Sequence, residues 1–540
     1  MNKEGAAGSV PAETAAKKIE SGTLSAAPAA EMGVPGLSSR RGDGPELVIG
    51  LIGAVGTDLA QVRTAVGEAL GAVSYGVETI RLSELLHQLP GGEELAKLEN
   101  EDERIDRHMD AGNKLRRDLG RGDALAGLAV AYIASLRKER SPQGESLERV
   151  AFVLSSLKNP SEVRALRNVY GPRFVLVSAH APRARRREKL MRDIARSRGA
   201  MHRADQFQER SEGLMERDER EEADVLGQNV RDSFTLADVF VEAEPREELD
   251  KYLRRFVQLF FGDPFQTPTK AEYAMFQAQA AALRSADLSR QVGAVVATPE
   301  GDIVAVGTNE VPKAFGGQYW ADDGSDERDF KRGFDSNETT KREALEEAFD
   351  RLASDGTIEG VGTLDDFVGA VQGTRLASIT EFGRPVHAEM AALLDAARRG
   401  VSVAGNVLFT TTFPCHNCAK HIVAAGIRKV IYREPYAKSL AAKLHPDAIV
   451  VDPALPEPER VGFQPFVGLA PPRYFDLFTK LKREEPDGQA VRWDPAASVP
   501  RLVVDDPAYR LTERFFLRGL SDDLEKVDGM PIHLIPEEAR

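Results

Sequence analysis

Between residues 387 and 426 the hydrophobic and polar positions change period twice. "HAEMAALLDAARRG" spaces Met390, Leu393 and Leu394 as on one face of a helix, and Gly400 ends it. "NVLFTTTF" is rich in β-branched and aromatic residues, which favours a strand. "PCHNCAKHIVAAG" returns to a helical pattern that begins with a proline and ends with a glycine. The pattern predicts helix, strand and helix in succession.

The same analysis extends this unit in both directions. It predicts a helix at Lys270–Ser285 and strands at Val292–Val296, Ile303–Val306, Lys429–Tyr432 and Ala448–Val451. Gly301 supplies the turn between the first two strands. The predicted order is therefore α-β-β-α-β-α-β.

The first half of the chain starts differently. "ELVIGLIGAVGTDLAQVRTAVGEAL" runs as apolar strand, glycine turn and helix, which is the shape of a P-loop that cradles phosphate on backbone amides. The candidate nucleotide-binding residues are Gly50, Gly53, Gly56 and Thr57. The P-loop rule then requires Gly-Lys-Ser, where this chain has Asp58, Leu59 and Ala60. The lysine for the phosphates and the hydroxyl for Mg²⁺ are both missing.

Further along, "RVAFVLSSLKNPSEVRALRNVYGPRFVLVSAHAPRARRREKL" resembles the nucleotide-kinase succession of strand, loop, strand and arginine-rich lid. Ser155 and Ser156 stand where that resemblance implies a metal-holding aspartate. We therefore expect a P-loop nucleotide-kinase-like α/β domain without phosphoryl transfer. It would bind a regulatory nucleotide or nucleic acid, or build an oligomer.

Composition narrows the class of protein. The chain has 540 residues, of which 42% are hydrophobic and 29% charged, and no apolar run approaches the ~20 residues of a membrane span. Met1–Gly44 is rich in Gly, Ala, Ser and Pro and has no apolar core, so it predicts a disordered tail and no secretory signal. Two cysteines without an export signal indicate the cytoplasm. A net charge of −14 argues against a surface devoted to nucleic acid.

The two cysteines, Cys415 and Cys418, fall in the first turn of the second predicted helix, where the helix dipole favours thiolates. With His387 they offer zinc one nitrogen and two sulfurs and leave the fourth tetrahedral position open for water. Glu389 lies two residues beyond the histidine and reaches that water without binding the metal. This H-x-E and P-C-x-x-C order is the signature of zinc nucleobase deaminases. Glu389 would carry a proton to N3 of cytosine and then to the departing ammonia.

Two other interpretations explain the cysteines alone. The pair could be a redox C-x-x-C or part of a structural zinc knuckle completed by His416 or His421. Neither interpretation needs the carboxylate of Glu389.

On these motifs, residues 263 to 480 resemble the cytidine and deoxycytidylate deaminase superfamily, which implies an α/β/α domain. The resemblance places Asn309 where the family's asparagine binds the sugar. An insertion at about 313–380 departs from the family and contains a predicted helix at Glu338–Leu352. It is either a solvated decoration or a lid in which Tyr319 and Trp320 stack on the base.

A degenerate kinase-like domain followed by such a deaminase resembles the bacterial anti-phage dCTP deaminases. The predicted division is 1–44 tail, 45–262 kinase-like domain and 263–540 deaminase-like domain. The resemblance implies hydrolysis of dCTP, or of dCMP, to the deoxyuridine nucleotide during infection. It also implies restraint by a small RNA or another inhibitor, and we expect a homo-oligomer.

The triphosphate would be bound by basic residues near the sugar. Arg290 and Lys438 are the leading candidates, and Arg284 and Arg473 are further ones. The alternatives are a deaminase acting on tRNA or single-stranded DNA, which needs a basic channel, and a non-catalytic nucleotide sensor in which zinc is structural.

Overall fold

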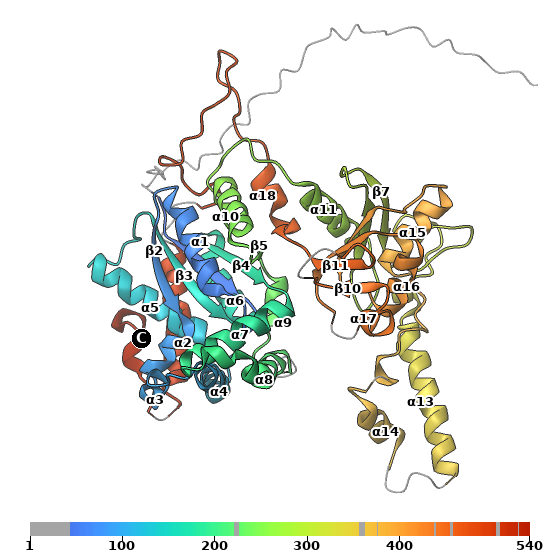
Figure 1. Ribbon diagram of the computed structural model, residues 1–540, viewed down its shortest axis with the longest axis horizontal. Helices are drawn as coiled ribbons and strands as arrows, with labels where there is room; N and C mark the ends of the chain where they lie inside the picture. Colours follow the sequence, from blue (N-terminus) through green and yellow to red (C-terminus); the bar gives the residue numbers. More distant parts are fainter. Residues whose placement is uncertain are drawn as a thin grey trace, which may run out of the picture. The chain divides into compact units, whose positions relative to one another are not determined.

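The computed structural model describes residues 44–540 apart from 221–225, 356–361, 375, 437–438, 454–456, 504–507 and 528. The predicted tail, except for Gly44, and the candidate Lys438 therefore lie outside the described residues. The described chain is mixed α/β and builds two six-stranded sheets (Figure 1).

The first sheet has the strand order β12-β5-β4-β1-β3-β2. Its strands are β1 Leu47–Ile52, β2 Gly76–Arg81, β3 Val150–Leu157, β4 Phe174–His180, β5 Val239–Glu242 and the two-residue β12 Gly468–Leu469. β1 to β5 pair in parallel, and β12 pairs antiparallel with β5. β1 is buried along its whole length, as expected for a parallel strand covered on both faces.

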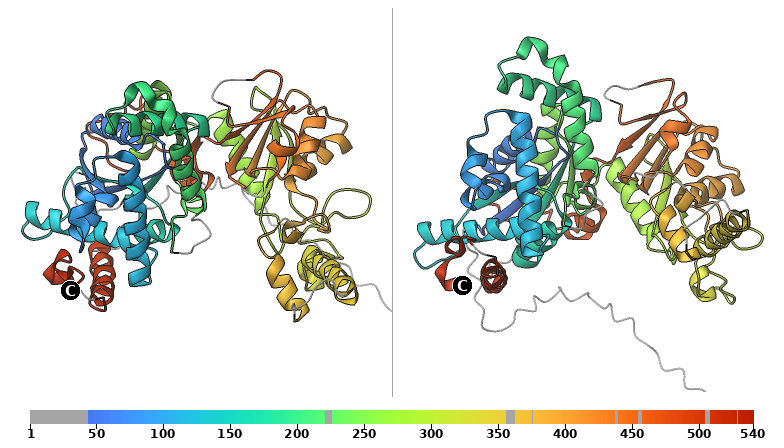
Figure 2. Two further views of the ribbon diagram at one scale, coloured as in Figure 1. Left: turned by 60° about the horizontal axis from the view of Figure 1, so that its bottom comes forward. Right: turned by 90° about the horizontal axis from the view of Figure 1, so that it is seen from below.

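Helices cover both faces of this sheet (Figure 2). The larger ones are α1 Leu59–Gly71, α4 Glu101–Leu119, α5 Ala124–Arg140, α6 Pro160–Tyr170, α7 Arg183–Ser197, α8 Gln208–Arg220 and α10 Arg246–Phe260. The shorter ones are α2 Leu82–Leu85, α3 Gly92–Ala96 and α9 Val230–Thr235. Alternate residues of β1 point into two separate cores, one built with α1 and α10 and the other with α5 and α6.

The last helix, α19 Ala508–Leu524, packs against α5 and α6 of this first layer. Arg137 of α5 donates to Glu513 of α19 over 2.7 Å and to Glu46 over 3.0 Å, and all three side chains are buried. Tyr509 donates its hydroxyl to the same Glu46 over 2.7 Å. The predicted 263–540 unit is thus too long, because the chain end returns to the first sheet. The pattern of an amphipathic helix shows which of its faces is buried but not which sheet that face will cover.

The second sheet has the order β10-β11-β9-β8-β6-β7. Its strands are β6 Gly293–Ala297, β7 Ile303–Thr308, β8 Val407–Thr412, β9 Lys429–Glu434, β10 Ile449–Val451 and β11 Val461–Pro465. Its helices are α11 Lys270–Ala282, α15 Ala388–Arg398, α16 His416–Ala424 and α17 Ala441–Leu444, whereas α18 Tyr474–Phe478 packs on α10 in the core of the first sheet. From α11 to β9 the elements follow the predicted order, with the insertion between β7 and α15.

Two glycines let helices approach opposite faces of this sheet. A Cβ on Gly293 of β6 would lie 1.9 Å from the Ala278 carbonyl oxygen of α11, and a Cβ on Gly307 of β7 would lie 2.1 Å from the Ala388 carbonyl oxygen of α15. Gly307 pairs with Ala294, the neighbour of Gly293, so the two glycines face opposite sides. The result is an α/β/α sandwich in which α15 is fixed at its first residue, next to His387.

The insertion forms α12 Asp329–Arg332, α13 Ser336–Ser354 and α14 Leu364–Val371. α13 contains the predicted helix Glu338–Leu352 and extends it at both ends. It packs on α14 through Phe349 and Phe367, whose ring centroids are 5.7 Å apart. Figure 1 shows this helix pair extending beyond the sheet that carries it.

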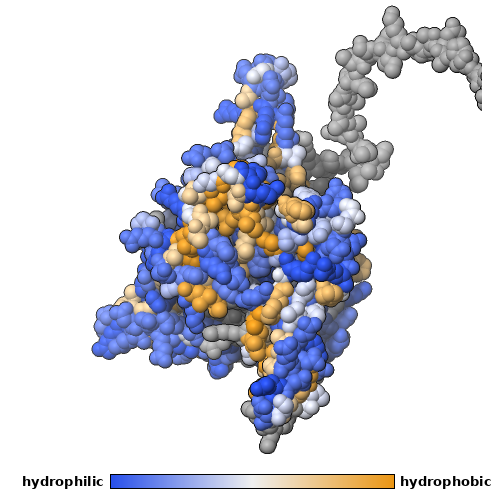
Figure 3. Space-filling model, turned by 90° about the vertical axis from the view of Figure 1, so that its right-hand side faces the viewer, coloured by the Kyte–Doolittle hydropathy of each residue, from blue (hydrophilic) through white to orange (hydrophobic). Residues whose placement is uncertain are grey.

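Among the described residues no single helix is long and apolar enough to cross a membrane, and only the bent pair α4 and α5 meets that criterion jointly. Apolar side chains are nevertheless exposed on the second sheet and its insertion, among them Val306, Phe315, Trp320 and Leu394. Figure 3 shows apolar surface gathered on the face that it views.

Candidate metal centre

The two helix starts that follow β7 and β8 bring the predicted ligands together. His387 is the N-cap residue of α15, and Cys415 is the N-cap residue of α16. Cys418 follows in the first turn of α16 and donates its backbone N–H to the Cys415 sulfur over 3.5 Å. The Nδ1 atom of His387 lies 3.3 Å from each sulfur. α15 and α16 are in contact, so two adjacent helix N-termini converge on one point.

This geometry fits zinc. The three donor atoms lie within 4.8 Å of one another, and they are the one group of this kind found among the described residues. Zn–N and Zn–S bonds at a tetrahedral angle place nitrogen and sulfur about 3.5 Å apart, close to the observed separation. Hydrogen bonds with Cys418 and His387 lower the pKa of the Cys415 thiol well below its usual range, which favours the thiolate that zinc binds. The set supplies three ligands and leaves a fourth position for a small molecule.

Glu389 lies in the first turn of α15 and is only 4% exposed. Burial raises the pKa of its carboxyl to about 7, and the nearby Cys415 adds to the shift. A carboxyl with this pKa can both accept and release a proton near neutral pH. Glu389 lines the same cavity as His387 and Cys415.

The cavity has a volume of about 270 Å³ and is open on one side. Asn309 and Arg290, two predicted substrate contacts, line it. The amide of Asn309 is already used, since its Oδ1 accepts from the Val292 N–H over 2.7 Å and its Nδ2 donates to the Arg290 carbonyl over 2.7 Å. Asn309 therefore holds the loop that presents Arg290. The Arg290 guanidinium lies 4.8 Å from the ring centroid of Tyr436, at the rim of the cavity.

Residues from both ends of the insertion also line the cavity, and the sequence analysis did not find them. They are Asp329, Asp335, Asn337, Glu338, Thr380, Gly383 and Pro385. Asn337 ties the two ends together, because its Nδ2 donates to the Ile379 carbonyl over 3.0 Å. Asp329 is paired with Arg384 over 2.6 Å, and Asp335 caps α13. The sequence did contain one indication that the insertion reaches the cavity, because the insertion ends shortly before the predicted zinc ligand His387.

The aromatic pair predicted to cover the base lies elsewhere. Trp320 stacks with Arg284, whose guanidinium is 3.6 Å from the ring centroid, and both line a separate cavity of about 740 Å³. Tyr319 lines neither this cavity nor the one beside Glu389, and its N–H donates to the Val311 carbonyl. In this structure neither residue therefore lines the cavity beside Glu389. Their side chains follow the start of the insertion, which packs back on α11 and α15.

Arg473 does not line the cavity beside Glu389 either, and it pairs with Asp238, the residue before β5, over 3.3 Å. Arg284 is held by stacking on Trp320 and by the Gln318 side chain. Among the described residues, Arg290 is the one cation of the predicted phosphate set that lines the cavity beside Glu389.

Of the four candidate nucleotide-binding residues in the first half, three line a cavity and one does not. Gly53, Gly56 and Thr57 line a cavity at the end of β1, and Gly56 has a φ of +88°, which favours glycine. Gly50 lies inside β1, where a Cβ would come within 2.6 Å of the Leu157 side chain. Gly50 thus leaves room for the Leu157 and Phe174 side chains of the neighbouring strands β3 and β4, and it lies outside the loop.

Comparison with known proteins supports the interpretation of this site as a zinc centre. Residues 268–434 match the family model of the cytidine and deoxycytidylate deaminase zinc-binding region. The deoxycytidylate deaminase of Enterobacteria phage T2 is 41% identical over 78 residues, which are 14% of this chain and 42% of that protein. The deoxycytidylate deaminase of Mus musculus is 26% identical over 161 residues, which are 30% of this chain and 62% of that protein.

A solved structure of dCMP deaminase from the cyanophage S-TIM5 with dCMP and dUMP is 22% identical and covers 37% of this chain and all of its own, with a TM-score of 0.22. The chain spans about two fifths of the length of the phage relatives that it matches. The matched region and the His-Cys-Cys group together support a zinc-binding domain similar to those of the deaminases, with Zn²⁺ as its cofactor.

Proposed function

We propose that this protein hydrolyses the amino group of a deoxycytidine nucleotide, dCTP or dCMP, to give the deoxyuridine nucleotide and ammonia. The observation that carries the proposal is the presence of Glu389, buried and with a raised pKa, in the same small cavity as His387 and Cys415. A structural zinc site or a redox pair gives no role to such a carboxyl. Its position beside three zinc ligands suits proton transfer during hydrolysis.

His387, Cys415 and Cys418 would hold the metal through one nitrogen and two sulfurs. Zinc, when bound, supplies Lewis acidity that lowers the pKa of a water ligand towards neutrality. The Glu389 carboxylate accepts a proton as the water oxygen adds to C4 of the base. It releases this proton to N3, then accepts the second proton from the new hydroxyl on C4 and releases it to the amino group, which leaves as ammonia. Burial raises the pKa of Glu389 to about 7, so its carboxyl can both accept and donate a proton near neutral pH.

Arg290 is the proposed contact to the substrate phosphates, and Lys438 remains a prediction outside the described residues. Asn309 is proposed to shape the sugar end of the cavity through the loop that it holds. The acidic residues that the insertion adds to the lining do not oppose a phosphate at Arg290, since Asp329 pairs with Arg384, Glu338 pairs with Lys341 and Asp335 caps a helix N-terminus.

For the whole chain, we propose depletion of the dCTP pool in anti-phage defence in the cytoplasm. The support is the resemblance in domain order, a degenerate P-loop kinase-like half followed by the deaminase half. The parallel order β2-β3-β1-β4-β5 with helices on both faces supports the kinase-like interpretation. A regulatory nucleotide or small RNA would act on that half. Exposed apolar residues such as Val306 and Leu394 support a homo-oligomer.

The experiment is direct. Purified zinc-loaded protein is incubated with dCTP, dCMP, deoxycytidine, tRNA and a single-stranded cytosine oligonucleotide, and the products are separated by chromatography. The proposal expects deoxyuridine nucleotide and ammonia in equal amounts from dCTP or dCMP. Deamination of the tRNA or the oligonucleotide with intact free nucleotides would replace it with a nucleic-acid deaminase. No product from any substrate would favour the sensor.

A further inference from the structure

Another cavity adjoins the one beside Glu389, and we call it the α9 cavity. It has a volume of about 380 Å³ and is lined by Arg231, Asp232 and Thr235 of α9, by Gln291, and by Glu434 and Pro435 around the end of β9. Arg290, Thr412 and Tyr436 line both cavities. The Arg290 guanidinium lies 4.8 Å from the ring centroid of Tyr436, so this pair stands where the two spaces meet.

The cavity beside Glu389 has little room for a nucleotide that carries several phosphates. Its volume of about 270 Å³ is below the ~300–1,000 Å³ of most small-molecule sites. A base at the metal centre, together with its sugar, takes up most of this space. A phosphate chain therefore has to extend beyond the cavity, and the wall shared with the α9 cavity offers one route.

The insertion contributes acids to the cavity beside Glu389, and it contributes no cation. Asp329, Asp335 and Glu338 line the cavity, whereas Arg290 is the one arginine or lysine among its described lining residues. The acids are engaged within the protein and tolerate one phosphate at Arg290, but they offer no charge to further phosphates. A longer phosphate chain is therefore favoured on the side of Arg290 that faces the α9 cavity.

The α9 cavity supplies a second positive charge. Arg231 lines it together with Arg290, so two guanidinium groups border one space. Of the acids in its lining, Glu434 pairs with Arg433, and Asp232 accepts from the side chain of the N-cap residue of α9 over 2.8 Å. Guanidinium groups bind phosphate oxygens through charge-assisted and often bidentate hydrogen bonds. The lining of this cavity thus suits phosphates that follow the first.

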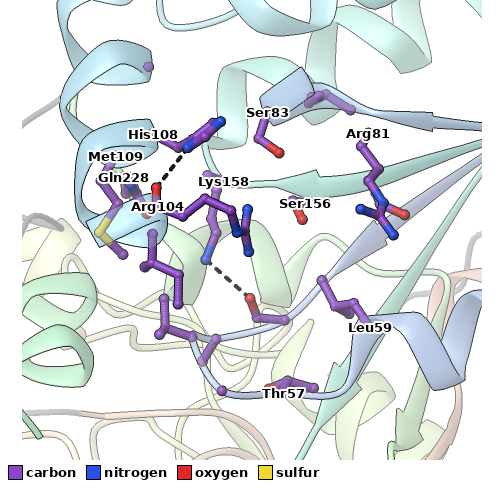
Figure 4. Close-up of a pocket in the computed structure, with 18 of the residues that line it drawn as sticks. Thr57, Leu59, Arg81, Ser83, Arg104, His108, Met109, Ser156, Lys158 and Gln228 are labelled. Carbon is purple, nitrogen blue, oxygen red and sulfur yellow. Dashed lines mark hydrogen bonds between the residues drawn. The ribbon is translucent and has the colours of Figure 1, made fainter. Parts of the chain in front are cut away.

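α9 is held in place by the first half of the chain. Gln228, two residues before it, lines the cavity of the first sheet at the end of β1 (Figure 4). The Asn229 N–H donates to the Lys158 carbonyl over 2.7 Å, and the Ser178 hydroxyl of β4 donates to the Phe234 carbonyl over 3.2 Å. α9 also contacts β9 of the second sheet. It therefore brings side chains of the first half to a cavity that adjoins the zinc centre.

We infer that Arg231 of the first half is a substrate contact of the deaminase site. The α9 cavity takes the β- and γ-phosphates of a deoxycytidine triphosphate whose α-phosphate lies at Arg290 and whose base lies at the metal centre. This inference rests on the proposed function. It makes the site composite, because the first half supplies the side chain that distinguishes a triphosphate from a monophosphate. No bond changes at these phosphates, so Arg231 acts on substrate affinity.

Steady-state deamination by the full-length zinc protein tests this inference. Arg231→Ala is expected to raise the KM for dCTP by about tenfold or more, because a charge-assisted phosphate contact is lost, and to keep kcat within about twofold. The affinity for dCMP, measured as a substrate or as a competitive inhibitor, should stay unchanged, since its single phosphate ends at Arg290. Arg231→Lys should recover part of the affinity for dCTP, because it restores the charge without the bidentate geometry.

Two further variants serve as references. Arg164→Ala is the matched control, since Arg164 is exposed on α6 and lines neither cavity. Arg290→Ala should weaken dCTP and dCMP alike. Inorganic tripolyphosphate is expected to inhibit dCTP deamination competitively in the wild type and about tenfold less well in Arg231→Ala. Thermal unfolding shows whether each variant is folded.

Three outcomes would contradict the inference. Equal KM values for dCTP in Arg231→Ala and Arg164→Ala would overturn it and leave the proposed deamination unaffected. An equal loss of affinity for dCTP and dCMP in Arg231→Ala would overturn it too, because Arg231 would then support the fold. A wild-type protein that deaminates neither nucleotide would overturn the proposed function itself, and this inference with it.

Discussion

The zinc cavity and the cavity of the first sheet both lie where helices begin at strand ends, yet their charged groups are organised in opposite ways. In the zinc cavity, donor atoms converge on one point with separations of 3.3 Å, and Glu389 is buried beside them. In the other cavity, most cations are neutralised by acids of the same domain, and an internal carboxylate occupies the loop.

The two arrangements suit different kinds of ligand. A convergent set of unsatisfied donors binds a metal and supports a chemical step. A set of cations paired within the domain stabilises the fold and leaves only local positions, such as Arg63, for an external anion.

Cys415→Ala should abolish zinc binding and deamination, because two ligands of this geometry do not retain the metal. Metal analysis of purified protein and the chromatographic assay measure both effects. His421→Ala is the control, since this histidine is exposed on the same helix and is not a ligand. Zinc retained in full by the cysteine variant would contradict the ligand assignment.

Glu389→Gln should keep zinc and the fold but lose about 10²–10⁴-fold in turnover, because the amide cannot transfer the proton. The exposed Glu343→Gln on α13 should behave like the wild type. Turnover and zinc content are measured on the same samples. A Glu389→Gln protein with near-normal turnover would remove this residue from the proposed chemistry.

Arg137→Met should lower the free energy of unfolding by about 3–5 kcal/mol, because it leaves the carboxylates of Glu46 and Glu513 buried without their cation. Urea unfolding at neutral pH measures this. Arg140→Met is the matched control, since its ion pair with Glu78 is exposed and contributes at most about 1 kcal/mol. Equal losses in the two variants would show that α19 is not held through Arg137.

Arg290→Ala should raise the KM for dCTP or dCMP by about tenfold or more and change deoxycytidine much less, since charge-assisted contacts to phosphate contribute about 1.5–3 kcal/mol. Steady-state kinetics on the nucleotide and the nucleoside measure the split. Equal losses on both would mean that Arg290 supports the loop around Asn309 and does not bind phosphate.

The smallest expected effect is the absence of phosphate release from ATP or GTP by the first half. Leu59 and Ala60 stand in place of the lysine and the hydroxyl, and Ser155 stands where an acid would hold Mg²⁺. A malachite-green phosphate assay on the wild type measures this. Steady phosphate release that persists through repeated purification would show that the first half has a phosphoryl-transfer site. The two cavities would then both be catalytic.

The zinc ligands could be predicted because each belongs to a local pattern. A histidine before a helix and a C-x-x-C behind a proline are both at helix N-termini, and β8 between them keeps those termini adjacent. The order of strands and helices from α11 to β9 followed from hydrophobic period alone. Chemistry that depends on neighbours in the chain is visible in the sequence.

The misplaced residues all depend on long-range packing. Trp320 was expected over the base, and its side chain instead stacks on Arg284 beside a different cavity. The insertion reaches the zinc cavity through Asn337 and Asp335, whose polar side chains are ordinary capping residues when viewed alone. Nothing in the spacing of these residues specifies which of them faces the site.

The sequence by itself determined the zinc donors, the carboxyl beside them and the succession of elements that brings them together, because these follow from periods of two and 3.6 residues and from helix-terminal preferences. Tertiary packing sets the rest: Asp218 accepts from the loop amide of Val55, α19 returns to the first sheet, and Arg63 has no ion-pair partner among the described residues. The physical reason is that burial and charge pairing are set by side chains far apart in the chain, and no local pattern records which of them meet.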